Sequence, residues 1–220
     1  MDDRQLLDSR VSPSEEALAR IEREFRAGFD LLTRIQQPAV AVFGSARVGD
    51  DDPAYVKARA VGGAFAREGW AVITGGGPGV MEAANRGAQE AGGLSVGLGI
   101  DLPHEQAFNP YLDLSHEFEH FYARKVCFVK PSEGFVVLPG GFGTLDETFE
   151  ALTLIQTGKA AMFPVVLLDS GYWDGLLDWL RDPVLTTGKL SPLDLGLVHT
   201  TDDPEVAARI VIDAYALKRA

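Results

Sequence analysis

The stretch GFVVLPGGFGTLDE, residues 134–147, contains the pattern that decides the fold. An apolar run over 134–138 passes at Pro139 into a glycine-rich turn, and a helical pattern follows directly. A short apolar run bounded by turn residues is typical of a strand buried on both faces. The stretch therefore predicts a strand, a tight turn and a helix in immediate succession.

The same order recurs along most of the chain. Apolar runs predict buried strands at 39–43, 70–74, 94–100, 134–138, 164–169 and 195–199. Helical patterns separate them, at 53–68, 78–91, 121–131, 144–157, 172–182 and 203–218. A weaker alternation from Leu112 to Glu119 indicates one further strand. Repeated strand and helix units predict an α/β fold, a Rossmann-like, doubly wound and mainly parallel sheet with helices on both faces.

A separate helix precedes this region. Ser14 followed by two glutamates is typical of an N-cap with an acidic first turn, and an amphipathic pattern runs from there to Gln37, before Pro38. We therefore expect an N-terminal extension and helix over 1–37 and one Rossmann-like domain over 38–220.

Composition excludes several classes of function. Twenty Lys and Arg against 32 Asp and Glu give a net charge of −12, which disfavours binding to nucleic acid or to an anionic membrane. The one cysteine, Cys127, lies among apolar residues, which indicates a buried thiol and excludes a disulfide framework. The N-terminus lacks a signal-peptide pattern, and no apolar run reaches the length of a membrane span. We expect a cytoplasmic protein with no bound metal or cofactor.

Ligands of open parallel sheets bind beyond the carboxyl ends of the strands, which directs attention to the turns at 44–52, 74–80, 100–111 and 139–144. Gly140, Gly141 and Gly143 can adopt positive φ and let backbone N–H groups approach an anion, and Thr144 is expected to cap the helix. This combination predicts a phosphate site. The alternative is a tight turn and an ordinary cap without a ligand.

A second glycine cluster, TGGGPGVM at 74–81, also joins a strand to a helix. Gly75 and Gly76 could contact the same ligand, or the glycines could only allow close packing, and the pattern does not decide between the two. The turn at Gly44 and Ser45 is comparable. Neither cluster matches the dinucleotide fingerprint well, although Asp101 after a strand leaves NAD binding open, and no P-loop is present.

The residues PGGFGTLDE, 139–147, resemble the PGGxGTxxE motif of the LOG ("Lonely guy") family, the cytokinin riboside 5′-monophosphate phosphoribohydrolases. The resemblance runs from about Val40 to Tyr215 and includes Arg124-Lys125. Family members were often labelled lysine decarboxylases. That activity needs a lysine Schiff base with pyridoxal phosphate, for which no lysine here is marked.

The resemblance implies that Arg124 and Glu147 are catalytic. It also implies substrate-binding residues, namely Gly44, Ser45, Gly75, Gly76, Glu105, Lys125, Gly140, Gly141, Gly143 and Thr144. The chain departs from the plant LOG pattern where Phe121-Tyr122-Ala123 precedes Arg124-Lys125 and where Asp146 replaces a common glutamate, which leaves the base specificity open. The long N-terminal segment resembles the larger, second type of member, which implies a homodimer or a higher oligomer such as a hexamer.

Hydrolysis of a ribosyl N-glycosidic bond builds positive charge at C1′, so a carboxylate there stabilises the transition state. Glu147 is the candidate, either as the base that activates water, which we favour, or as a nucleophile. Asp146 adjoins it on a helix, where neighbouring side chains point about 100° apart, so both cannot serve one carbon. The remaining alternatives are a non-catalytic sensor of a nucleotide such as AMP, and a solvent-exposed Arg124-Lys125 face with no catalytic role.

Overall fold

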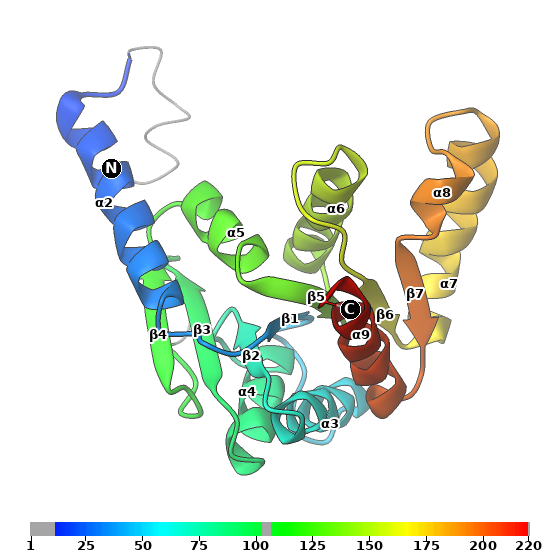
Figure 1. Cartoon of the computed structure of the whole chain (residues 1–220), viewed down its shortest axis with the longest axis horizontal. Helices are drawn as coiled ribbons and strands as arrows, with labels where there is room; N and C mark the ends of the chain where they lie inside the picture. Colours follow the sequence, from blue (N-terminus) through cyan, green and yellow to red (C-terminus); the bar gives the residue numbers. More distant parts are fainter. Residues whose placement is uncertain (1–11, 103–106, 220) are drawn as a thin grey trace.

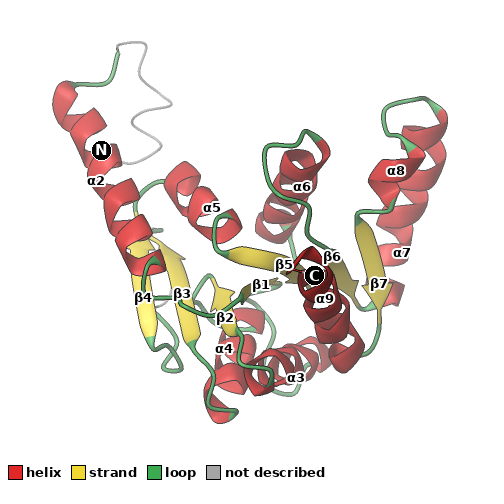
Figure 2. Cartoon of the chain, in the orientation of Figure 1, coloured by secondary structure: helices red, strands yellow, loops and turns green. Residues whose placement is uncertain are grey.

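The structure of the chain, a computed structural model, describes residues 12–102 and 107–219. Its centre is a parallel sheet of seven strands in the order β4-β3-β2-β1-β5-β6-β7 (Figures 1 and 2). The strands are β1 (Ala39–Phe43), β2 (Ala71–Thr74), β3 (Ser95–Ile100), β4 (Leu114–Phe118), β5 (Ser132–Val137), β6 (Val165–Leu168) and β7 (Val198–Thr201). The predicted α/β class and the additional strand near 112–119 are confirmed.

Alternate residues of the strands face two separate cores. In β1, Ala41 and Phe43 belong to the core under α2, α5, α6 and α7, whereas Val40 and Val42 belong to the core under α3, α4 and α9. The helices are α2 (Glu15–Leu32), α3 (Pro53–Arg67), α4 (Val80–Glu90), α5 (Phe121–Val129), α6 (Phe142–Gln156), α7 (Ser170–Trp179), α8 (Pro192–Leu195) and α9 (Pro204–Arg219). Helices therefore cover both faces, as a doubly wound sheet requires.

The largest differences from the expected boundaries concern three elements. The strand expected at 195–199 lies at 198–201, because Ser191 and Asp194 form a capping box that starts the short helix α8. The helix expected over 172–182 begins at Ser170 and passes into a π-helical turn, η1 (Leu180–Val184). Ser14 caps α2 as predicted, its Oγ accepting the Ala17 N–H at 3.2 Å, but α2 ends at Leu32 rather than near Gln37.

Helices α3 and α4 pack with their backbones in direct contact. A Cβ at Gly62 would overlap the carbonyl oxygen of Ala84, and a Cβ at Gly87 would overlap that of Arg59. Only glycine permits this approach. The contact fixes α4 and, with it, the glycine-rich turn that precedes α4.

Strand β1 pairs with β2 on one side and with β5 on the other, so the chain winds in opposite directions from this point. Ligands of such sheets bind where the strand order reverses, beyond the carboxyl ends of the two central strands. The turns after β1 and β5 lie at that place. In the described ranges 12–102 and 107–219, we find no helix with the length and apolar character needed to cross a membrane.

Candidate active site

Three glycine-rich turns are joined at the carboxyl edge of the sheet. The Ser45 N–H donates to the Pro139 carbonyl at 2.9 Å, and the Val80 N–H donates to the Ser45 carbonyl at 3.0 Å. Gly44 lies against Val80, since a Cβ added at Gly44 would be 2.6 Å from Val80 Cγ1. The turns after β1, β2 and β5 therefore form one continuous surface, as their positions in the sequence predicted.

The turn after β5 leads into the N-terminus of α6. Gly141 is the N-cap at φ −91°, and the first hydrogen bond back along the helix is from the Leu145 N–H to the Gly141 carbonyl at 3.0 Å. The N–H groups of residues 142–144 precede that bond, and the N-terminal N–H groups of a helix have no partner within it. A Cβ at Gly141 or Gly143 would meet nothing within 4 Å. This end of α6 is open and suited to an anion.

Two details of this turn differ from the prediction. Gly140, Gly141 and Gly143 all have a negative φ, so the turn contains no left-handed residue. Thr144 does not cap the helix, since Gly141 occupies that position and Thr144 becomes the third helical residue, buried beside Gly140. The proposed contact of the Thr144 hydroxyl with a phosphate stays a prediction.

The turn after β2 is held by a buried network of polar side chains. Thr74 Oγ1 donates to Asn85 Oδ1 at 2.6 Å and accepts the Gly76 N–H at 2.9 Å. Asn109 Nδ2 lies 3.0 Å from three acceptors, the carbonyls of Gly76 and Gly77 and Asn85 Oδ1. The N–H and the carbonyl of Gly76 therefore both form hydrogen bonds within the protein. The contact of Gly76 with substrate stays a prediction.

Arg124, on α5, points toward this second turn. Its Nε donates to the Leu98 carbonyl at 2.7 Å, and its guanidinium carbon lies 5.0 Å from the centre of the Phe128 ring. A Cβ at Gly75 would be 2.6 Å from Arg124 Nη2 and equally close to Met81 Sδ. Gly75 is thus the residue that makes room for the arginine at the edge of the sheet.

Lys125 faces α6 and is surrounded by carboxylates. Its Nζ lies 2.8 Å from Asp146 Oδ2, 2.8 Å from Glu150 Oε2 and 3.7 Å from Glu147 Oε1. Burial lowers the pKa of Lys125, but the hydrogen bonds to Asp146 and Glu150 outweigh it, so the pKa is raised. Lys125 therefore stays protonated beside Glu147.

Glu147 is the most unusual group of the site. The residue is 5% exposed, and its Oε2 is buried with no hydrogen-bond partner among the residues that the structure describes. Burial raises the pKa of its carboxyl to about 7, and the charges of Lys125 and Arg124 offset part of that effect. A carboxyl with a pKa near neutrality can accept and release a proton at physiological pH.

The neighbouring carboxylate behaves differently. The side chain of Asp146 is 54% exposed, whereas that of Glu147 is 6% exposed. Both carboxylates approach Nζ of Lys125, at 2.8 Å for Asp146 and 3.7 Å for Glu147. That only one of these adjacent helical residues faces a reacting carbon therefore stays a prediction.

The structure places Arg124 beside Gly75 and Lys125 beside Glu147, and the charges of both cations act on the Glu147 carboxyl. Glu105 lies outside the described residues, and its contact with substrate stays a prediction. Asn85 and Asn109, which hold the second turn in shape, gave no signal in the sequence. Cys127 is buried as expected, and burial raises the pKa of its thiol to about 11.

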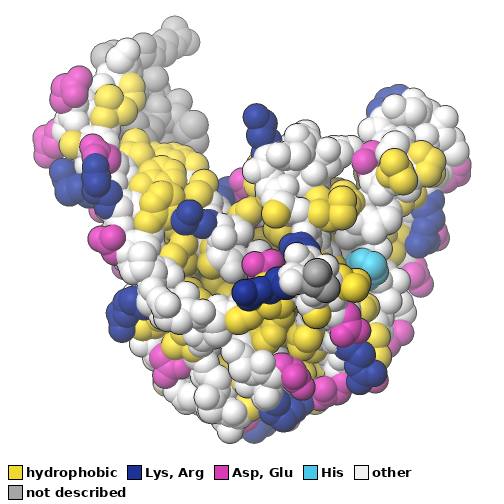
Figure 3. All heavy atoms as spheres, viewed as in Figure 1, with side chains coloured by type: hydrophobic (Ala, Val, Ile, Leu, Met, Phe, Trp, Pro, Cys, Tyr) yellow, Lys and Arg dark blue, Asp and Glu magenta, His cyan; other side chains and the backbone are white. Residues whose placement is uncertain are grey.

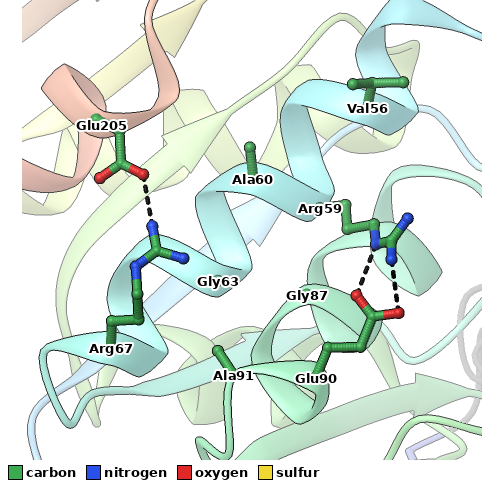
Figure 4. Close-up of a pocket in the computed structure, with 9 residues that line it drawn as sticks. All are labelled: Val56, Arg59, Ala60, Gly63, Arg67, Gly87, Glu90, Ala91 and Glu205. Carbon is green, nitrogen blue, oxygen red and sulfur yellow. Dashed lines mark hydrogen bonds and ion pairs between the residues drawn. The ribbon is translucent and has the colours of Figure 1, made fainter.

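A groove of about 550 Å³ lies elsewhere, between α3, α4 and α9 (Figure 4). Arg59 and Arg67 line it, but Arg59 pairs with Glu90 at 2.7 Å and Arg67 pairs with Glu205. None of the residues that the motifs predicted lines this groove. Its charges are satisfied by each other and its glycines serve helix packing, so we do not assign the chemistry to it.

The fold and the site define a Rossmann-like α/β protein with a buried acid beside glycine-rich turns. A family described as "Possible lysine decarboxylase" matches residues 81–211. The chain belongs to this family, the LOG family, since it also shares 34% identity over 157 residues with a cytokinin riboside 5′-monophosphate phosphoribohydrolase of Mycobacterium tuberculosis, covering 68% of this chain and 80% of that protein.

Further relatives agree with this assignment. A probable cytokinin riboside 5′-monophosphate phosphoribohydrolase of Oryza sativa subsp. japonica is 32% identical, over 70% of this chain and 63% of its own length. Among solved structures, the molybdenum cofactor carrier protein of Chlamydomonas reinhardtii is 27% identical with a TM-score of 0.62, covering 82% of this chain and 99% of that one. The molybdenum cofactor binding protein of Rippkaea orientalis is similar, at 25% identity and a TM-score of 0.60, covering 83% and 99%.

Proposed function

We propose that this protein hydrolyses the N-glycosidic bond of a nucleoside 5′-monophosphate, a cytokinin riboside 5′-monophosphate or AMP, to the free base and ribose 5-phosphate. One observation carries the proposal: the buried Glu147 carboxyl, with Oε2 unpaired among the described residues, lies 3.7 Å from Lys125 Nζ, within the field of Arg124, on a helix whose N-terminus is open. The names of the relatives from Mycobacterium tuberculosis and rice support the same reaction.

In this proposal the 5′-phosphate binds at the turn of Gly140, Gly141 and Gly143, where the N–H groups at the start of α6 and the helix dipole favour an anion. Thr144, Ser45 and Gly44 lie on or beside the same joined turns. Arg124, whose guanidinium lies at Gly75, supplies a fixed positive charge for the phosphate or keeps Glu147 ionised.

The bond that breaks joins C1′ of the ribose to a ring nitrogen of the base. As it lengthens, its electron pair leaves with the base, and positive charge develops on C1′ and the ring oxygen, which the Glu147 carboxylate stabilises. A water molecule attacks C1′ and gives one proton to Glu147. The new C1′–OH belongs to ribose 5-phosphate, the departing base takes up a proton at its nitrogen, and Glu147 returns its proton to solvent.

A decarboxylase reaction does not suit the lysine of this site. A Schiff base with pyridoxal phosphate requires a neutral lysine amine. Lys125 lies among three carboxylates that keep it protonated, and its pKa is raised. Lys125 is better placed to hold α5 and α6 together and to moderate the proton affinity of Glu147.

We further propose that the protein acts as a homo-oligomer, a dimer or a larger assembly. Large apolar side chains are exposed on α5 and at the start of α6, with Phe142 92% exposed and Val126 42% exposed. Figure 3 shows hydrophobic side chains gathered between α2 and α6. Exposed apolar patches of this kind mark protein interfaces. Equilibrium sedimentation of the wild type tests this directly, and a monomer at micromolar concentration would refute it.

The function is tested by incubating the purified protein with AMP and with isopentenyladenosine monophosphate and measuring free base by chromatography. The expected result is release of base and ribose 5-phosphate in equal amounts, with little release from the nucleosides that lack phosphate. Arg124→Ala should lower kcat/KM by at least about a hundredfold, because a positioned charge is removed. Glu205→Gln, in the distant groove, serves as the matched control and should match the wild type.

The second candidate is a binding protein without catalysis, since two similar structures are those of a molybdenum cofactor binding protein and a molybdenum cofactor carrier protein. Binding of AMP measured by calorimetry, with no base released from either nucleotide, would favour that candidate. It would also refute the hydrolase.

A further inference from the structure

The N-terminal helix α2 packs closely against the helix that carries Arg124. A Cβ at Gly28 would be 2.7 Å from Cys127 Sγ and 3.0 Å from the Phe118 ring. Lys130, at the end of α5, lies 5.3 Å from the centre of the Phe29 ring. Helix α2 is therefore fixed on α5 and β4, as Figure 1 also shows.

One carboxylate lies within this contact. The Glu24 side chain is 8% exposed, and its Oε2 is 2.6 Å from Nδ1 of His120, which is 1% exposed. Its Oε1 accepts the His120 N–H at 3.2 Å and also the Glu119 N–H. Three donors from one turn of chain thus converge on one buried carboxylate, an arrangement that a chance surface contact does not produce.

Glu24 also completes the start of α5. His120 is the N-cap of that helix, and Glu24 accepts the backbone N–H groups of His120 and of Glu119 directly before it. A negative charge at a helix N-terminus is favourable. In the first turn that follows, the Arg124 N–H donates to the His120 carbonyl at 3.3 Å.

We propose that Glu24 is a positioning residue for Arg124, so that the N-terminal helix forms part of the catalytic unit. Glu24 fixes His120, and His120 fixes the backbone of Arg124 one turn later. From there the side chain reaches the Leu98 carbonyl on β3 at 2.7 Å. Without the Glu24 carboxylate, two backbone N–H groups and the buried His120 ring lose their acceptor, the start of α5 shifts, and the bond between Arg124 Nε and Leu98 lengthens.

The first test needs no activity. Solvent exchange of the Arg124 Nε–H is followed by nuclear magnetic resonance in the wild type, Glu24→Gln and Glu24→Ala, with the signal assigned from Arg124→Lys. The matched control is Glu22→Ala, on the same helix, where the glutamate side chain is 62% exposed and pairs with Arg26. Exchange should accelerate by about tenfold or more in Glu24→Ala, less in Glu24→Gln, and not in Glu22→Ala. Unchanged exchange in both Glu24 variants would overturn the proposal.

The second test rests on the proposed function. Glu24→Ala should lower kcat/KM for base release by about tenfold in the folded protein, since small displacements of a catalytic group cost this much or more. In the Arg124→Lys background the same change should have no further effect, because the two residues act as one unit. Additive losses would overturn the proposal. If Glu24→Ala does not fold, Glu24→Gln carries both tests, and if the wild type releases no base, only the proposed function fails.

Discussion

Replacing Glu147 by Gln should make the protein more stable at alkaline pH while removing its activity. An exposed glutamate has a pKa of 4.5, whereas burial raises the pKa of Glu147 to about 7 in the folded chain. Between these values the unfolded state loses its proton and the folded state keeps it, so the free energy of unfolding falls as pH rises. This loss of unfolding free energy is absent well below pH 4.5 and complete well above pH 7.

The size of the effect follows from the same interval. Each pKa unit is worth about 1.4 kcal/mol, so the ionised Glu147 costs the fold about 3 kcal/mol at pH 8.5 and under about 1 kcal/mol at pH 5. Gln has similar shape and no charge. The difference in unfolding free energy between Glu147→Gln and the wild type should therefore grow by about 2.5 kcal/mol from pH 5 to pH 8.5.

Urea unfolding followed by tryptophan fluorescence, at one fixed protein concentration, measures this difference. Glu205→Gln is the control, because that side chain is 58% exposed and its pH dependence should be small. A difference between Glu147→Gln and the wild type that stays constant across this pH range would refute the assignment of a buried, proton-binding Glu147.

Three further results are expected. The kcat/KM for base release should rise with pH through an apparent pKa of about 7, since Glu147 must lose its proton to act as the base. Initial rates in buffers of constant ionic strength measure this, and a kcat/KM independent of pH from 5.5 to 8.5 would contradict it. Gly75→Ala should lower kcat/KM by about tenfold or more without unfolding the protein, because the new Cβ displaces Arg124. The control is Gly175→Ala, where a Cβ meets nothing within 4 Å. Equal kcat/KM values for the two variants would contradict the prediction. Gly87→Ala should lower the unfolding free energy by about 1–3 kcal/mol in urea titrations, because a Cβ there overlaps the backbone of α3, and unchanged stability would show that the two helices can separate freely.

Much of the fold could be predicted because both faces of the sheet are covered. Strands such as β1, buried at all five residues, read as continuous apolar runs that glycine-rich turns interrupt. The strand expected from the apolar run at 195–199 begins three residues later, because Leu195 belongs to the short helix α8. The sequence also contained the correct signal, since Ser191-Pro192 with Asp194 is a helix start.

The site divides in the same way. The convergence of the turns followed from strand order, because carboxyl ends of parallel strands meet at one edge. The partners of Lys125 could not be read from the sequence, since Asp146 and Glu150 meet it only when α5 lies beside α6. Asn109 and Glu24 were missed for the same reason: their partners are 24 or more residues away in the chain, and no local pattern marks them.

The most direct test of the account is a single-turnover measurement of base release from AMP by the wild type and by Glu147→Gln, with each protein in excess over the nucleotide and binding measured separately. If Glu147 is the base that activates water, the variant should bind AMP about as tightly as the wild type and release adenine at least about a thousandfold more slowly. Release at the wild-type rate by folded Glu147→Gln would contradict the account.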